Sequence, residues 1–293
     1  MELYKKALDI QTRYVGPYHP DVRSANRGIG LLLRDQRRFA DADAYFHKAL
    51  ETAEVSLGPR HIRTTDYQIL IVTNLMSQDK LDEAEQVARS CVEIRNHPSP
   101  PDDDPSRRAQ GHYFLGEVLF RKGRYEEALT HYRIAHDLRE HMPGRTEELI
   151  AYSLSSLGET LTAMGNPREG LPYLERALSY RESRPLSERV PVAVQALART
   201  EFALSRTLWA LGRPEQKARA LELAYKAQQD YEQYGSRPDS ELPQVSKWIA
   251  TISPSKGKPL PGGPGAATKP AKALKPLDPP PPAAHRPAPP PEP

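Results

Sequence analysis

The stretch "HYFLGEVLFRKGRYEEALTHYRIA" (112–135) has the pattern of two helices joined by a short turn. Gly116 lies in the first segment, and the second segment carries Ala128 and Ala135 on either side of Tyr132. Helices that cross at close distance need small residues where their backbones meet, and a larger side chain beside them to fill the gap. The stretch therefore predicts a closely packed helix pair.

The pattern of the second segment occurs six times along the chain, each time around a small residue. These central residues are Ala7, Ala49, Cys91, Ala135, Ala177 and Ala227, at spacings of 42, 42, 44, 42 and 50 residues. Nineteen residues before four of them stand Gly30, Val72, Gly116 and Gly158, and Ser205 takes the corresponding place before Ala227. A period of this length indicates an array of repeated helix pairs.

A Gly-Pro-x-His motif marks two of the junctions, in "VGPYHPDV" (15–22) and "LGPRHIRT" (57–64). We expect Gly16 and Gly58 to end a helix and each His to lead into the next one. A metal site is not expected at His19 and His61, because a zinc site needs three or four convergent ligands.

The repeat resembles the tetratricopeptide repeat, in the 42-residue form typical of kinesin light chains and of some bacterial proteins. The stretch 112–135 carries its Leu-Gly, Gly-x-Tyr, Ala, Tyr and Ala positions in register, although His112 replaces the usual opening aromatic residue. The second unit departs further, with Val72 in place of Gly and Cys91 in place of Ala. The last unit is similar to the C-terminal repeat region of bacterial serine/threonine kinases, but no kinase motif is present. The resemblance implies an all-α, right-handed superhelical solenoid of antiparallel helix pairs.

We predict four segments from this register. Residues 1–20 would hold an unpaired second helix, 21–235 five helix pairs, 236–252 a capping helix and 253–293 a disordered tail rich in Pro and Lys. The unpaired helix suggests that Met1 is not where the array begins. Its apolar side is also expected to allow end-to-end self-association.

Charge and composition separate the tail from the rest of the chain. Residues 251–293 hold 15 of the 30 prolines and no aromatic residue, which predicts disorder. They also carry six basic and two acidic residues, whereas residues 1–250 carry 35 basic and 36 acidic ones. A nucleic-acid partner is therefore expected to bind only through the positive charge of the Lys-rich tail. With no apolar stretch of the roughly 18 residues that a membrane span requires, and a charged N-terminus, we expect a cytoplasmic protein without a membrane partner.

No residue stands out as catalytic, cofactor-binding or metal-binding. His131, His136 and His141 are five residues apart, which places them on diverging sides of one helix, where we expect solvated positions. Cys91 occupies a small interhelical position and is expected to be buried and inert. Asp104 or Ser106, after three consecutive aspartates, is expected to cap a helix. Phosphate-loop, nucleophile-elbow and zinc-protease motifs are missing from the sequence.

In an array of this family, the first helices face a concave groove, so the positions one residue after the Gly and one turn before it are candidate partner contacts. Besides Ile69, which stands at the same repeat position, the candidates are Arg27, Leu31, Thr73, Tyr113, Glu117, Ser155, Glu159, Phe202 and Arg206. The mixture of charged and apolar residues favours an amphipathic peptide or helix as ligand. That these residues are merely exposed helix positions stays an equal alternative. The family's Lys/Asn clamp for a terminal carboxylate is not matched.

The resemblance implies a non-catalytic adaptor or scaffold in bacterial signalling, with a protein or peptide partner and no cofactor. The alternative is the detached regulatory or docking region of a serine/threonine kinase or signalling ATPase.

Overall fold

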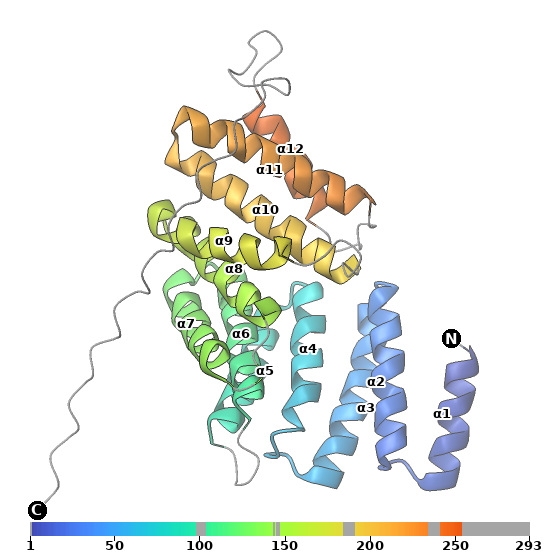
Figure 1. Cartoon of the computed structure of the whole chain (residues 1–293). Coiled ribbons are helices and arrows are strands. Elements are labelled where there is room, and N and C mark those ends of the chain that lie inside the picture. The colour runs from blue at the N-terminus through green and yellow to red at the C-terminus, as the bar shows by residue number, and fades with distance from the viewer. Residues whose placement is uncertain are drawn as a thin grey trace, which may run out of the picture. The chain divides into compact units, whose positions relative to one another are not determined.

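The computed structural model describes residues 2–97, 104–142, 144, 147–183, 191–233 and 241–253, which form twelve helices and no strand (Figure 1). The helices are α1 (Glu2–Val15), α2 (Pro20–Asp35), α3 (Phe39–Leu57), α4 (Thr65–Ser77), α5 (Leu81–Asn96), α6 (Pro105–Arg121), α7 (Tyr125–His141), α8 (Glu147–Ala163), α9 (Pro167–Glu182), α10 (Pro191–Leu211), α11 (Pro214–Gln233) and α12 (Leu242–Ile252). The predicted all-α repeat architecture is confirmed.

The helices pack as consecutive pairs, α2 with α3 and so on to α10 with α11. Each second helix also packs on the first helix of the following pair, and the first helices α4, α6, α8 and α10 contact one another in that order. This places the first helices along one inner surface. At the ends of the array, α1 packs against α2, and α12 packs against α11 (Figure 1). The predicted tail lies outside the described residues, apart from Ser253.

Close crossings within the pairs depend on glycine. A Cβ atom added to Gly116 would lie 2.7 Å from the ring of Tyr132, and one added to Gly30 would lie 2.5 Å from the ring of Phe46. Such distances are shorter than side-chain contacts allow, so the ring of the second helix occupies the space that a Cβ would fill. The predicted close approach of paired helices is confirmed at both crossings.

The second unit, which departs most from the repeat pattern, exchanges large and small residues between its two helices. Val72 replaces the glycine of the first helix, and Ala88 stands where the first and third units have Phe46 and Tyr132. Both side chains are completely buried in the main apolar cluster. The exchange keeps the packed volume similar, because the larger residue has moved from the second helix to the first.

The two Gly-Pro-x-His motifs join successive units as expected. Gly16 follows α1 with φ +87°, and Gly58 ends α3 with φ +101°. The histidines have a more specific role than predicted, because Nδ1 of His19 accepts a hydrogen bond from the backbone N–H of Asp21, at 3.2 Å, and Nδ1 of His61 accepts one from Arg63, at 3.1 Å. His19 thus caps the start of α2, whereas His61 satisfies an N–H group in the turn that leads into α4.

Candidate functional site

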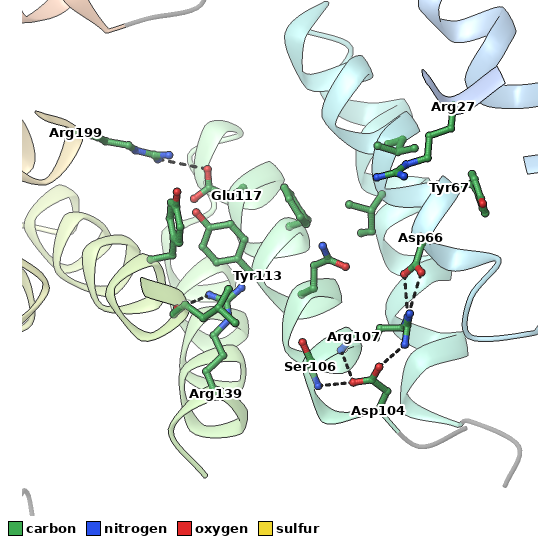
Figure 2. Close-up of a pocket in the computed structure, with 16 residues that line it drawn as sticks. Arg27, Asp66, Tyr67, Asp104, Ser106, Arg107, Tyr113, Glu117, Arg139 and Arg199 are labelled. Atoms are coloured by element: carbon green, nitrogen blue, oxygen red, sulfur yellow. Dashed lines mark hydrogen bonds and ion pairs between the residues drawn. The ribbon is translucent and has the colours of Figure 1, made fainter. Parts of the chain in front are cut away.

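The inner surface encloses a cavity of about 830 Å³, which we call the inner groove. Figure 2 shows that side chains from several helices of different units converge on it. Its lining residues are Arg27 of α2; Asp66, Tyr67, Ile69 and Leu70 of α4; Asp104, Ser106, Arg107, Gln110, Tyr113, Phe114 and Glu117 at or within α6; Arg139 of α7; Leu149 and Tyr152 of α8; and Arg199 of α10. The groove therefore belongs to the array as a whole, and no single repeat could form it.

An ion-pair cluster forms one wall of the groove, where α4 meets the start of α6. The carboxylate of Asp66 lies 2.9 Å from Nη2 of Arg95 and 3.1 Å from Nε of Arg107. Asp104 accepts a hydrogen bond from the backbone N–H of Ser106 at 2.9 Å and also pairs with Arg107 (Figure 2). The predicted N-cap role of Asp104 is confirmed, and the same side chain helps to hold Arg107 against α4.

A second cluster surrounds Glu117, on the opposite side of the groove. Its Oε1 accepts hydrogen bonds from the hydroxyls of Tyr132, at 2.8 Å, and Ser156, at 3.2 Å. Its Oε2 lies 3.4 Å from Nη2 of Arg199 (Figure 2). Burial alone would raise the pKa of Glu117, but the charge of Arg199 and the two hydroxyl donors outweigh burial and hold the pKa below its usual value.

Aromatic rings fill the space between the two charged clusters. The ring of Tyr113 lies edge-on to Phe114, with centroids 5.4 Å apart, and edge-on to Tyr152, at 6.4 Å. Burial, with a smaller contribution from the charge of Glu117, raises the pKa of Tyr113 to about 12. The ring is therefore neutral at physiological pH and presents an apolar surface with a polar tip.

The structure separates the nine residues predicted to face the groove. Arg27, Tyr113 and Glu117 line the cavity. Glu159 and Arg206 lie outside its lining and pair with each other at 3.3 Å. The half-buried Leu31 and Thr73 are also outside the lining, and Oγ1 of Thr73 accepts a hydrogen bond from Arg34 at 3.0 Å. Two further positions are buried in contacts between helices. Ser155 lies where α8 packs on α10, and its Oγ lies 3.1 Å from Oγ1 of Thr200. Phe202 of α10 belongs to an apolar cluster with residues of α11 and α12.

Several groove residues were missed by the sequence reasoning, above all Asp66, Tyr152, Arg199 and Arg139. The first three share one repeat position, six residues before Val72, Gly158 and Ser205 respectively. This position lies about two turns before the small residue, outside the two positions from which groove contacts are predicted. Arg139 comes from a second helix, from which no groove residue was expected.

The histidine predictions need correction at two of the three positions. His131 is half-buried rather than solvated, and its Nδ1 lies 2.9 Å from Nδ1 of the buried His112. Burial, together with the charge of His131, lowers the pKa of His112 to about 4. His136 is also half-buried, whereas His141 is exposed as predicted. Among the described residues, no three His, Cys, Asp or Glu side chains are grouped so that they could hold a metal ion.

Cys91 is completely buried, and burial raises the pKa of its thiol, as expected for an inert cysteine. Within the described ranges, no helix is both long enough and apolar enough to span a bilayer.

A model of the tetratricopeptide repeat matches residues 21–97 and 107–183, which together make up more than half of the sequence. The chain belongs to the tetratricopeptide repeat family. Families of this kind are protein-interaction scaffolds, so membership implies a protein partner. A comparison with curated protein sequences finds no match.

Solved structures with the same fold include those of kinesin-light-chain type. BtubC (BKLC) from P. vanneervenii is 16% identical, with a TM-score of 0.62, and the match covers 80% of this tetratricopeptide repeat chain and 90% of that one. A putative kinesin light chain from Podosopora anserina, with nearly identical repeats, is also 16% identical, with a TM-score of 0.55 over 74% and 99% of the two chains.

A third similar structure is a signal transduction ATPase with numerous domains from Pyrococcus horikoshii, which has a tetratricopeptide repeat sensor. It is 16% identical, with a TM-score of 0.53, and the match covers 85% of this chain but only 40% of the ATPase.

Proposed function

We propose that this tetratricopeptide repeat protein is a non-catalytic adaptor that binds a peptide or helix of a partner protein in the inner groove. The observation that carries this proposal is the cavity of about 830 Å³, in which the rings of Tyr113, Phe114 and Tyr152 lie between two charged clusters. Aromatic side chains offer large contact areas at low entropic cost, and charged groups at the rim fix the orientation of a ligand.

The size of the groove supports a segment rather than a whole folded partner. Ligand cavities of roughly 300–1,000 Å³ hold small molecules or a few side chains. A peptide or helix would place several side chains in the cavity and continue along the inner surface. The fixed spacing of the repeat units would then determine where the bound segment lies on the adaptor.

The test compares partner capture by the full-length protein and two variants, with an extract of the source organism. Phe114→Ala removes a half-buried ring from the groove, and Tyr225→Ala removes an exposed ring of α11 that does not line the groove. We expect a partner that the wild type and Tyr225→Ala capture equally and that Phe114→Ala captures at least tenfold less. Equal capture by all three proteins would place the binding surface outside the groove.

The alternative function is a sensor or docking region for a kinase or signalling ATPase. The similarity to the repeat sensor of the Pyrococcus horikoshii ATPase favours it. Such a role predicts that the purified chain changes the rate of a kinase or ATPase from the same organism. A partner that binds in the groove and has neither activity would favour the adaptor.

A further inference from the structure

Three arginines occupy the same position in successive units, four residues after the central small residue of the second helix. They are Arg95 of α5, Arg139 of α7 and Arg181 of α9, and each is at most 5% exposed. Each reaches from its own second helix to residues of the first helices. We call this set the arginine ladder.

The two outer members of the ladder each have an acidic partner on a first helix. Nη2 of Arg95 lies 2.9 Å from Asp66 of α4, and Nε of Arg181 lies 3.6 Å from Glu148 of α8. A buried guanidinium is costly unless a carboxylate or several acceptors compensate its charge. These two contacts show how the fold meets that requirement at this repeat position.

Arg139, the middle member, lacks such a partner. Its Nη1 donates to the backbone carbonyl of Leu149, at 3.2 Å, and to Oγ of Ser153, at 2.7 Å. Its guanidinium lies over the ring of Tyr113, 4.6 Å from the centroid (Figure 2). No carboxylate of the described residues forms an ion pair with it: α6 carries Gln110 at the repeat position of Asp66 and Ser106 at that of Glu148.

The acidic residues of the groove are already paired with other arginines. Asp66 and Asp104 pair with Arg107, and Glu117 pairs with Arg199. The exposed Arg27 also has no ion-pair partner within the described part of the chain. Among the described residues that line the groove, two cations therefore have no ion-pair partner, whereas every carboxylate has one.

We propose that Arg139 is a carboxylate-binding position, and that the segment bound in the groove carries an Asp or Glu side chain that pairs with it. The proposal rests on the proposed function, because it names the chemistry of the ligand for the same groove. The planar guanidinium can hold a carboxylate through two parallel N–H donors while its face stays stacked on Tyr113. Arg27 would attract the same acidic segment at the opposite wall.

The experiment is a selection of 12-residue peptides from a random display library on the full-length protein. Selected peptides are then synthesised, and each acidic residue is replaced in turn by its amide. We expect enrichment of Asp or Glu at one fixed position, and a loss of affinity of at least tenfold for the amide peptide at that position. The loss should shrink to less than threefold in Arg139→Met.

Arg133→Met is the matched control, because Arg133 is exposed on the same helix and does not line the groove. It should retain the full preference for the acidic peptide. If Arg139→Met does not fold, Arg139→Lys takes its place, because it keeps the charge but loses the two parallel donors. The amide substitution in the peptide needs no protein variant and tests the wild type directly.

The outcomes separate this proposal from the proposed function. Two outcomes would overturn the role of Arg139 alone. The selected peptides could lose binding to Phe114→Ala yet show no preference for an acidic residue, or the acidic preference could persist in Arg139→Met. Failure to select any groove-dependent peptide would overturn both.

Discussion

Arg199 of α10 pairs with Glu117 of α6 at one side of the inner groove, at 3.4 Å, although 82 residues separate them in the chain. The same guanidinium lies 3.7 Å from Glu159 of α8 and 3.6 Å from Glu241, next to α12. One side chain thus connects helices from three successive units and the C-terminal cap. The separation of these helices along the groove depends on contacts that no single repeat contains.

We predict that Arg199→Met lowers the free energy of unfolding by about 1–3 kcal/mol at pH 7. Removing the cation leaves three poorly solvated carboxylates close together, and the partial exposure of Arg199 reduces the cost below that of a fully buried pair. Urea denaturation measures the change. Arg219→Met, which breaks an exposed pair with Glu175, should cost less than about 0.5 kcal/mol. Equal effects of the two substitutions would show that the pair between Arg199 and Glu117 contributes no more to stability than an exposed ion pair.

A second prediction concerns the glycine at a helix crossing. Gly116→Ala should destabilise the protein by about 1–3 kcal/mol, because its Cβ would meet the ring of Tyr132 at 2.7 Å. Gly28→Ala is the control, since a Cβ there meets no atom within 4 Å and should stabilise α2 by about 0.5–1 kcal/mol. The denaturation midpoints of the two variants should therefore move in opposite directions. A midpoint for Gly116→Ala at or above that of the wild type would contradict the packing described here.

The helix pairs could be predicted from the sequence because their determinants are local. Gly116 and Tyr132 lie 16 residues apart, and their pairing follows from helix periodicity alone. The groove could be predicted only in part, because neighbouring units do not pack identically. Ser155 shares its repeat position with Tyr113, but its small side chain contacts Thr200 of α10 and does not line the cavity, as Tyr113 does.

The charged contacts of the groove could not be predicted for a similar reason. Arg199 reaches Glu117 only because the superhelix brings α10 near α6, and repeat spacing does not specify the curvature. Arg139 was missed because its lack of an acidic partner is recognised only by comparison with Arg95 and Arg181. The sequence contained that signal, as an arginine at the same position in three successive units.

A third prediction concerns Glu201, a completely buried carboxylate between α10 and α11. One of its oxygens lies 3.2 Å from Nζ of Lys226, which also pairs with Glu182 at 3.1 Å. Burial raises the pKa of Glu201 to about 7; Lys226 opposes this change, and the charges of Asp230 and Glu182 add to it. Between the unfolded value of 4.5 and about 7, the folded state binds more protons at this site. The contribution of Glu201 to stability therefore falls as pH rises through that range.

Glu201→Gln should remove this pH dependence. We expect it to stabilise the protein by about 1–3 kcal/mol at pH 8, where wild-type Glu201 is ionised, and to have little effect at pH 4.5, where it is protonated in the folded state. Urea denaturation of wild type and variant at both pH values gives the difference. Glu222→Gln, at an exposed position of α11, should show no such difference. A variant that is less stable than the wild type at pH 8 would mean that the pair with Lys226 outweighs the cost of burial.

The last prediction concerns the apolar side of α1, which has no buried residue. Leu3 is 81% exposed and Ile10 is 63% exposed, and Tyr4 stands at the repeat position where Phe46 and Tyr132 pack against a glycine. Because such a stripe favours association, we expect the protein to self-associate through α1 at high concentration. Leu3→Lys combined with Ile10→Lys should abolish the association, measured by light scattering, and change the free energy of unfolding of the monomer by less than about 1 kcal/mol. The control, Val55→Lys, replaces an exposed apolar residue of α3 and should leave the association intact. A wild type that stays monomeric at millimolar concentration would contradict the prediction, as would association that survives the double substitution.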